Sequence, residues 1–560
     1  QVYMYPHVLT NLIPFTTLFH ESEFTMTDVS GPFALFSNFL MYGISAIFVV
    51  FIPYVIYEYV AAKVRGDCFP ESYPFETSIR FLFSKSHNHL FLDMARHMED
   101  KLGLETCCMN LIGLPWLVVT NDVKNVTHTL KNVKLYGKGP KWYSRMYHLL
   151  GNGIFSADGD LWYKHRKTSS HLFNLNKFRT EMSTTFNDHC TTLIKCIQSR
   201  SKGEGSNKKG NSFDLQDLLL KFTLDSIGKI AFGKTLGALN KDRVLFAESF
   251  DFCQFQANNS FIDPTWLFKR YLTPSGWLYH YHIRRVNRFA YDLVKERRQV
   301  VENEIKEHGK IVSTDLLSLY MERSSEEGIS DKELRDIILN FLIAGRDTTA
   351  NALSWAFYRL CIHPEVQEKA YGEIRKLASE FSLDMPLSPS PHAEDPTDTG
   401  PEFPFACIQK MEYIEAFCME VLRLYPSVPK IGKYALQDDV LPDGTVVKEG
   451  MMMVFSPWVM GRTERLWENC EEFRPERFLE NKKPSPYLFT AFQGGPRTCL
   501  GQNMALLEMK CVVARLLHNF EFKLEMDPDE VTYVNTLVLP MRDGLRVSVK
   551  PRSSAAFREF

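Results

Sequence analysis

Apolar residues recur at helical spacing along most of this chain, which predicts a largely α-helical protein. We expect helices over residues 123–130, from residue 161 onwards, and over 213–232, 284–310, 330–362 and 411–425. Shorter apolar or alternating runs predict strands over residues 111–119, 435–441, 445–448, 531–538 and 545–549. The last four strands would form two hairpins. The pattern therefore predicts a mostly α fold with a small β region.

The most apolar stretch, residues 31–57, has no charged side chain over 27 residues. As a helix it would extend about 40 Å, which is enough to cross a hydrocarbon core of about 30 Å. Asp28 precedes it whereas Lys63 and Arg65 follow it, so the positive-inside rule places the rest of the chain in the cytosol. The alternatives are a buried hairpin and a cleaved signal peptide, although a signal peptide would have a basic start and a shorter apolar run.

These features divide the chain into four parts. We expect a disordered tail at residues 1–30, a transmembrane anchor at 31–57, one large domain at 66–551 and a short tail at 552–560. Two glycosylation sequons, at Asn125 and Asn258, offer a check on the orientation, because a cytosolic domain would leave both unmodified.

The composition excludes some classes of protein. A net charge of −2 gives no electrostatic argument for binding nucleic acid. Twelve cysteines in 560 residues are too dilute for a disulfide scaffold, and only Cys107 and Cys108 lie close together in the sequence. Most of the thiols are therefore expected to be reduced.

One cysteine lies in a loop that could make it a metal ligand or a nucleophile. Residues 492–501, FQGGPRTCLG, form a glycine-rich loop that delivers Cys499 to the start of an apolar-periodic helix. A thiol in this position meets the positive end of the helix dipole and free N–H donors, both of which favour the thiolate. Such a thiolate suits a metal ligand or a nucleophile, although the same residues could also form an ordinary glycine turn.

The spacing Phe-x-x-Gly-x-Arg-x-Cys-x-Gly in this loop resembles the haem-binding loop of the cytochromes P450. The resemblance implies that Cys499 is the axial ligand of the iron of haem b, that Arg497 pairs a haem propionate and that Phe492 packs beside the sulfur. Gly501 completes the motif, and the N–H groups after the cysteine would tune its electron donation. The implied fold is that of the cytochromes P450.

A second pair of residues resembles a propionate clamp of that family. Trp162 and Arg166 are four apart on a predicted helix and therefore share one face. An indole N–H and a guanidinium could reach one anionic edge together. The alternative is a solvated arginine beside a packed tryptophan.

The long helix predicted at residues 330–362 carries the sequence AGRDTT at 344–349. Gly345 weakens a helix and the Thr348 hydroxyl can hydrogen-bond backbone carbonyls, so we expect a local bulge. The sequence resembles the acid–alcohol pair of the cytochromes P450, which implies that Asp347 and Thr348 deliver protons to dioxygen. Asp347 could instead pair Arg346 or another cation.

Three further residues resemble the buried ion triad of the family. Glu420 and Arg423 lie three apart on one helix, and Arg477 follows in the sequence FRPERF at 473–478. Their order before the cysteine loop fits the family pattern.

The sequence suggests a lipophilic substrate. The runs at residues 344–349, at 150–162 and at 441–444 look most like the fatty-acid and alkane hydroxylases of plants and fungi, which oxidise a terminal carbon. We expect an apolar channel, although each lining residue could be plain core. The candidate lining residues are Ile343, Ala344, Val428, Ile431, Leu537 and Val538. A substrate carboxylate would need a cation, for which Lys138 and Lys141 are candidates.

The resemblance also implies partners and a location. Dioxygen would be the co-substrate, and electrons would come from NADPH through a flavoprotein reductase, because no fused flavin or iron–sulfur module is recognisable. The predicted protein is a single-pass monooxygenase of the endoplasmic reticulum membrane with a cytosolic catalytic domain. The alternatives are a sterol or terpenoid hydroxylase and a haem-binding sensor without turnover.

Overall fold

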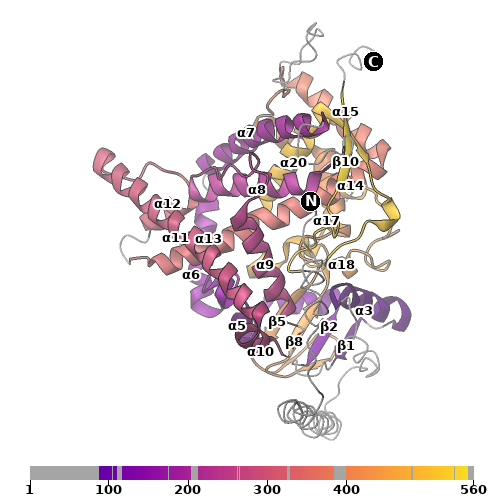
Figure 1. Cartoon of the computed structure of the whole chain (residues 1–560). Helices are drawn as coiled ribbons and strands as arrows, with labels where there is room; N and C mark the ends of the chain where they lie inside the picture. The colour runs from indigo at the N-terminus through magenta and orange to yellow at the C-terminus, as the bar shows by residue number, and fades with distance from the viewer. Residues whose placement is uncertain are drawn as a thin grey trace, which may run out of the picture.

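The structure is a computed structural model that describes residues 87–552, apart from 104, 110–115, 174–175, 203–211, 262, 264, 324–327, 384–398, 481–483 and 535. Helices dominate this part of the chain, and the strands β1, β2, β5 and β8 lie together at one end of it (Figure 1). The larger helices are α3 (His87–Leu102), α4 (Val123–Lys131), α5 (Gly139–Leu150), α6 (Gly159–Phe173), α7 (Asn176–Ser201), α8 (Leu215–Phe232), α9 (Leu245–Asn259), α10 (Trp266–Leu272), α11 (Pro274–His308), α12 (Leu316–Arg323), α13 (Asp331–Leu342), α14 (Thr348–Ile362), α15 (Pro364–Glu380), α17 (Glu412–Leu424) and α20 (Gln502–Asn519).

Short helical turns complete the set. They are α16 (Phe405–Gln409), α18 (Pro457–Met460), α19 (Arg477–Glu480), the π-helix η2 (Ile343–Asp347) and the 3-10 turns η3 (Thr490–Phe492), η4 (Gly495–Arg497) and η5 (Pro528–Glu530). The helix α14 contacts α8, α15, α17 and α20, so the segment 331–362 lies in the middle of the helical layer.

The strands form three small sheets. The strands are β1 (Thr106–Met109), β2 (Leu117–Thr120), β3 (Tyr136–Gly137), β4 (Phe213–Asp214), β5 (Ile431–Ala435), β6 (Asp439–Val440), β7 (Val446–Val447), β8 (Met452–Phe455), β9 (Phe520–Leu524) and β10 (Arg546–Pro551). The largest sheet has the order β1-β2-β8-β5-β3, in which only β2 and β8 are parallel. The other sheets are β4-β10-β9 and the hairpin β6-β7.

Most of the predicted elements are confirmed. The helices α4, α6, α8 and α17 lie where the apolar periodicity places them, and β6 pairs with β7 as the first hairpin predicts. The helix predicted at 284–310 begins earlier, at Pro274, which takes the first helical turn after the Thr273 cap.

The second predicted hairpin is wrong. The strand β10 pairs with β9 and β4, whereas Tyr533 and Met541 share only an isolated bridge. Phe520 and Phe522 are both buried and two apart, so β9 offers an inward apolar face directly after α20. The local sequence pattern could not show that β10 pairs with β9 and not with residues 531–538.

The glycosylation check loses its value in the folded protein. The Asn125 side chain is fully buried, and its amide donates to Thr106 Oγ1 at 3.0 Å and to Asp443 Oδ2 at 2.6 Å. Asn258 is also buried. Neither amide is accessible to a glycosylating enzyme after folding, so an unmodified sequon would not report the orientation.

The predicted tail and anchor at residues 1–57 lie outside the described residues. Among the helices of residues 87–552 that the structure describes, none combines the length and the apolar character needed to cross a membrane.

Candidate active site

The loop of Cys499 closes on itself before α20 begins. The Cys499 N–H donates to the carbonyl oxygen of Phe492 at 2.8 Å. Gly495 has a φ of +67°, and a Cβ there would lie 2.5 Å from the carbonyl oxygen of Leu130 at the end of α4. A glycine is therefore required at this point, because the loop lies directly against the α4 backbone.

Cys499 is the only exposed cysteine in the described part of the chain. Burial raises the pKa of the Cys499 thiol, and the Gly501 N–H and the Arg166 charge lower it only in part. The Gly501 N–H and Arg166 thus favour the thiolate as the sequence predicts, and a bound metal ion would favour it further.

The predicted propionate clamp lies beside this loop. The Arg497 guanidinium stacks over the Trp162 ring at 4.4 Å, and Arg166 donates to the carbonyl oxygen of Thr498. Arg497 also donates to Asp158 Oδ1 at 2.6 Å. The structure thus brings Trp162, Arg166 and Arg497 together, and it adds a carboxylate that sequence reasoning missed.

Asp158 links the loop to the start of α5. Its carboxylate accepts hydrogen bonds from the N–H groups of Lys138 and Gly139 at 2.8–2.9 Å. The turn before α6 thus supplies a side chain that binds the first N–H groups of α5.

A second missed residue is Lys433 on β5. Its side chain is 2% exposed, and no carboxylate of the described residues lies within ion-pair distance of it. Burial lowers the pKa of Lys433 well below its usual value, and the charges of Lys138 and Arg497 lower it further. The alternation of buried residues along β5 places position 433 inward, so a lysine at an inward strand position was the signal.

These cations outnumber the anions around them. Among the residues that the structure describes, Asp158 is the one carboxylate that opposes the charges of Lys138, Lys433 and Arg497. The Arg497 Nε is buried and finds no hydrogen-bond partner in the same part of the chain. The residues present therefore fit a cofactor that brings its own carboxylates and a metal ion for the thiol, as haem does.

The segment predicted to bulge forms the π-helix η2. The Thr348 hydroxyl donates to the carbonyl oxygen of Ala344 at 2.6 Å, as expected. The Thr223 hydroxyl of α8 donates to the carbonyl oxygen of Arg346 at 3.0 Å. Two hydroxyl groups thus occupy carbonyls inside the helix, which accounts for the widened turn.

Asp347 is the last residue of this π-helix, and its side chain is buried. Its Oδ2 accepts a hydrogen bond from Gln254 Nε2 at 2.8 Å, and its Oδ1 accepts one from Arg346 at 2.8 Å. Arg346 also pairs with Asp251 of α9. Burial raises the pKa of Asp347 to about 6, while Arg346 opposes that shift. The pairing with Arg346 that the sequence left open is therefore present.

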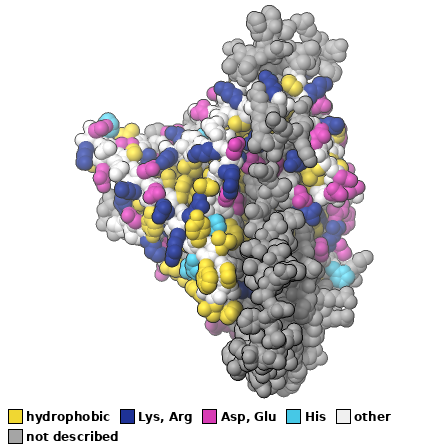
Figure 2. Space-filling model, in the orientation of Figure 1, with side chains coloured by type: hydrophobic (Ala, Val, Ile, Leu, Met, Phe, Trp, Pro, Cys, Tyr) yellow, Lys and Arg dark blue, Asp and Glu magenta, His cyan; other side chains and the backbone are white. Residues whose placement is uncertain are grey.

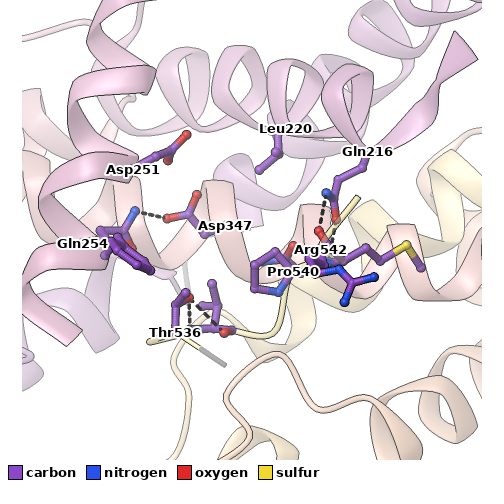
Figure 3. A pocket seen from close by; sticks show the side chains of 12 residues that line it. Gln216, Leu220, Asp251, Gln254, Asp347, Thr536, Pro540 and Arg542 are labelled. Carbon is purple, nitrogen blue, oxygen red and sulfur yellow. Dashed lines mark hydrogen bonds between the residues drawn. The ribbon is translucent and has the colours of Figure 1, made fainter. Parts of the chain in front are cut away.

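A small cavity of about 40 Å³, partly open to solvent, adjoins this carboxylate. Asp251, Gln254 and Asp347 point toward it from α9 and the π-helix, and Thr536 and Arg542 border it from the C-terminal segment (Figure 3). The carboxyl group of Asp347 thus lies at the wall of this cavity.

The candidate channel residues separate into several environments. Val538 lines the cavity beside Asp347. Ile343 belongs to the main core, whereas Ile431 and Val428 pack with Val126 of α4 in a smaller cluster. Leu537 is half-buried against the main core, and Ala344 is half-buried in η2. Their role as channel residues stays a prediction.

The predicted ion triad is formed and fully buried. Arg423 Nε donates to Glu420 Oε2 at 2.8 Å, and Arg477 Nε donates to Glu420 Oε1 at 3.1 Å. The remaining guanidinium donors reach backbone carbonyls, including that of Cys470 at 2.7 Å. Glu420 thereby ties α17 to α19 and to the segment that leads to the cysteine loop.

The family model for cytochrome P450 matches residues 87–545. This chain belongs to the cytochrome P450 family. Cytochrome P450 704B1 of Arabidopsis thaliana is 37% identical over 472 residues, which cover 79% of this chain and 88% of the relative. Cytochrome P450 704C1 of Pinus taeda is 37% identical over 487 residues, which cover 84% of this chain and 90% of the relative. The crystal structure of the cytochrome P450DA heme domain has the same fold, with a TM-score of 0.69 and 20% identity over 87% of this chain and 98% of that domain.

Membership of the cytochromes P450 makes this protein a monooxygenase that uses haem b and dioxygen, with electrons from NAD(P)H through a reductase. When bound, the haem activates dioxygen and inserts one oxygen atom into a C–H bond. The residues that would hold it are Cys499 at the iron, and Arg166, Arg497, Lys433 and Trp162 at the carboxylates.

Proposed function

We propose that this cytochrome P450 hydroxylates fatty acids at the terminal carbon. The observation that carries the substrate class is sequence similarity. The runs at residues 344–349, 150–162 and 441–444 resemble those of fatty-acid and alkane hydroxylases, and plant cytochromes P450 match more than three quarters of the chain.

Two side chains are suited to the proton transfers of the reaction. Water in the partly open cavity can exchange protons with Asp347 Oδ2, because Gln254 and Arg346 hold that carboxyl group at the cavity wall. The Thr348 hydroxyl, one residue further along the helix, donates to the Ala344 carbonyl oxygen and would pass a proton onward. Asp347 would collect protons and Thr348 would deliver them.

The location and the electron donor are part of the same proposal. Residues 31–57 would anchor the chain in the endoplasmic reticulum membrane, with the catalytic domain in the cytosol. A membrane-bound flavoprotein reductase would then supply electrons from NADPH at the same surface.

The test is a product assay with the full-length protein in membranes. We expect laurate or palmitate to be hydroxylated at the terminal carbon only when reductase, NADPH and dioxygen are all present. The absence of product over a panel of fatty acids would contradict the substrate class. Hydroxylation of a sterol or terpenoid in the same assay would establish the alternative class instead.

A further inference from the structure

Two buried arginines lie together and have no acidic partner among the described residues. Arg145 of α5 and Arg270 of α10 are 7% and 6% exposed. Both guanidinium groups stack on the ring of Trp266, at 5.1 Å and 4.8 Å. Among the residues that the structure describes, no carboxylate lies within ion-pair distance of either one. Buried charges of this kind normally have a counter-charge.

The hydrogen bonds of the pair leave donors unused. Arg145 donates to the backbone carbonyls of Ser260 at 2.8 Å and Lys141 at 3.1 Å, which fixes its position. Arg270 rests over Trp266 and Tyr279, and its buried Nη1 has no hydrogen-bond partner among the described residues. Arg270 is therefore the free donor of the pair, already held in place by aromatic rings.

Neighbouring titratable groups do not supply the missing negative charge. Asp263 is engaged with Lys269 at 2.7 Å, and Asp336 is engaged with Arg335 at 2.7 Å. Burial and the charge of Arg270 lower the pKa of His148. Within the part of the chain that the structure describes, the arginine pair therefore lacks a counter-charge.

The surface around the pair is apolar. Seven large hydrophobic side chains of α10 and the start of α11 are between 42% and 66% exposed. They are Leu267, Phe268, Tyr271, Leu272, Trp277, Leu278 and Tyr281. Figure 2 shows hydrophobic side chains gathered where α10 and the start of α11 lie in Figure 1. An anion with an apolar chain suits this combination better than an inorganic ion does.

The helix α9 connects the arginine pair to the oxygen side of the site. Gln254 on α9 bonds Asp347, and Ser260 at the end of α9 bonds Arg145. Six residues separate Gln254 from Ser260, which corresponds to about 9 Å along a helix axis. The arginine pair and the oxygen helix therefore contact the same helix, six residues apart.

We propose that Arg270, held beside Arg145, binds the carboxylate of the substrate. This assignment rests on the proposed fatty-acid function and explains why the distal end of the chain would be oxidised. Of the two lysines predicted for this role, Lys138 lies over Trp142 and beside Arg497 and Asp158, which places it with the cofactor cluster, whereas the role of Lys141 stays a prediction.

The test compares an acid with its uncharged ester. Purified full-length haem protein is titrated with laurate and with methyl laurate, and the displacement of the iron-bound water is followed by absorbance. Arg270→Met removes the charge while a long apolar chain still fills the space between the rings. We expect it to raise the Kd of laurate about tenfold or more, because a charge-assisted hydrogen bond is lost, while the Kd of methyl laurate stays within about twofold.

Two controls keep the result specific. Arg284→Met removes an exposed arginine of α11 and should change neither Kd. Arg270→Lys keeps the charge and should retain most of the preference for the acid. If Arg270→Met fails to incorporate haem, Arg270→Gln removes the same charge and is read in the same way.

If Arg270→Met weakens the binding of laurate and of methyl laurate equally, or leaves the Kd of laurate unchanged, the carboxylate site is overturned. The proposed fatty-acid function would remain intact. If the wild-type protein binds neither laurate nor its ester, the proposed substrate class fails and the carboxylate site with it.

Discussion

At the scale of single residues, Asp347 carries a charge that the folded protein disfavours. Its folded pKa is about 6, above its usual value of 3.8, because the carboxyl group is buried. The folded state therefore binds more protons than the unfolded state between these two values. The free energy of unfolding therefore falls as the pH rises from about 3.8 to about 6, and the whole loss is present above pH 6.

We predict that Asp347→Asn stabilises the protein at pH 7.5 by roughly 1–3 kcal/mol and has little effect near pH 4. Thermal unfolding at several pH values measures this. Asp251→Asn is the matched variant: it removes the half-exposed partner of the buried Arg346 and should lower the melting temperature. A melting temperature that falls for Asp347→Asn at pH 7.5 would show that the charged form is stabilised after all.

The Thr348 hydroxyl has a separate prediction. Thr348→Ala should keep the fold and the substrate affinity but reduce the product formed per NADPH about tenfold or more, because a positioned proton donor is lost. Thr349→Ala removes the neighbouring hydroxyl, which bonds Glu508 instead, and should leave that ratio unchanged. Equal ratios for Thr348→Ala and the wild type would remove Thr348 from proton delivery.

Sequence motifs located the residues that act within one segment but not those that depend on tertiary partners. Asp347 and Thr348 lie in one short run, so their neighbourhood could be predicted. Lys433 and Arg270 carry no motif, and their importance comes only from burial without an acidic partner. That property exists only once distant segments have packed together.

At the scale of elements, the π-helix η2 depends on a close approach to α8. A Cβ at Gly345 would lie 2.6 Å from Ile227 Cδ1 and 2.7 Å from Cγ1. Glycine has a low helix propensity, but at this position it allows α8 to pack closely on the widened turn.

We predict that Gly345→Ala destabilises the protein by roughly 1–2 kcal/mol, because overpacking outweighs the gain in helix propensity. In an Ile227→Ala background the same change should be neutral or stabilising, because the clashing atoms are gone. Chemical denaturation of the wild type, the two single variants and the double variant measures the four free energies of unfolding that this double-mutant cycle needs. An unchanged cost in the second background would show that the glycine is needed for its backbone alone.

The element predictions succeeded where a pattern was local. Helical periodicity placed α4, α8 and α17 because each has its own apolar face. The hairpin predicted at 531–549 failed because β10 pairs with β9, which lies on the other side of that segment in sequence. Strand partners depend on contacts that a local alternation does not encode.

At the scale of the whole molecule, the triad of Glu420, Arg423 and Arg477 joins the helical layer to the cysteine loop. All its charges are satisfied inside the protein, so removal of the shared acid would leave two buried arginines without a counter-charge. We predict that Glu420→Ala lowers the free energy of unfolding by about 3–5 kcal/mol, with little haem-containing protein recovered.

Glu380→Ala provides the comparison, because Glu380 pairs with Lys410 on the surface. That change should cost less than about 1 kcal/mol. Similar losses for the two variants would mean that the triad is no more important than a surface pair.

The central claim is that Cys499 is the thiolate ligand of the haem. The most direct measurement is the absorption spectrum of the reduced protein with carbon monoxide, recorded for the wild type, Cys499→Ser and Cys361→Ser. The account predicts the red-shifted Soret band of a thiolate-ligated haem in the wild type and in Cys361→Ser, and its loss in Cys499→Ser. A red-shifted band that persists in Cys499→Ser would contradict it.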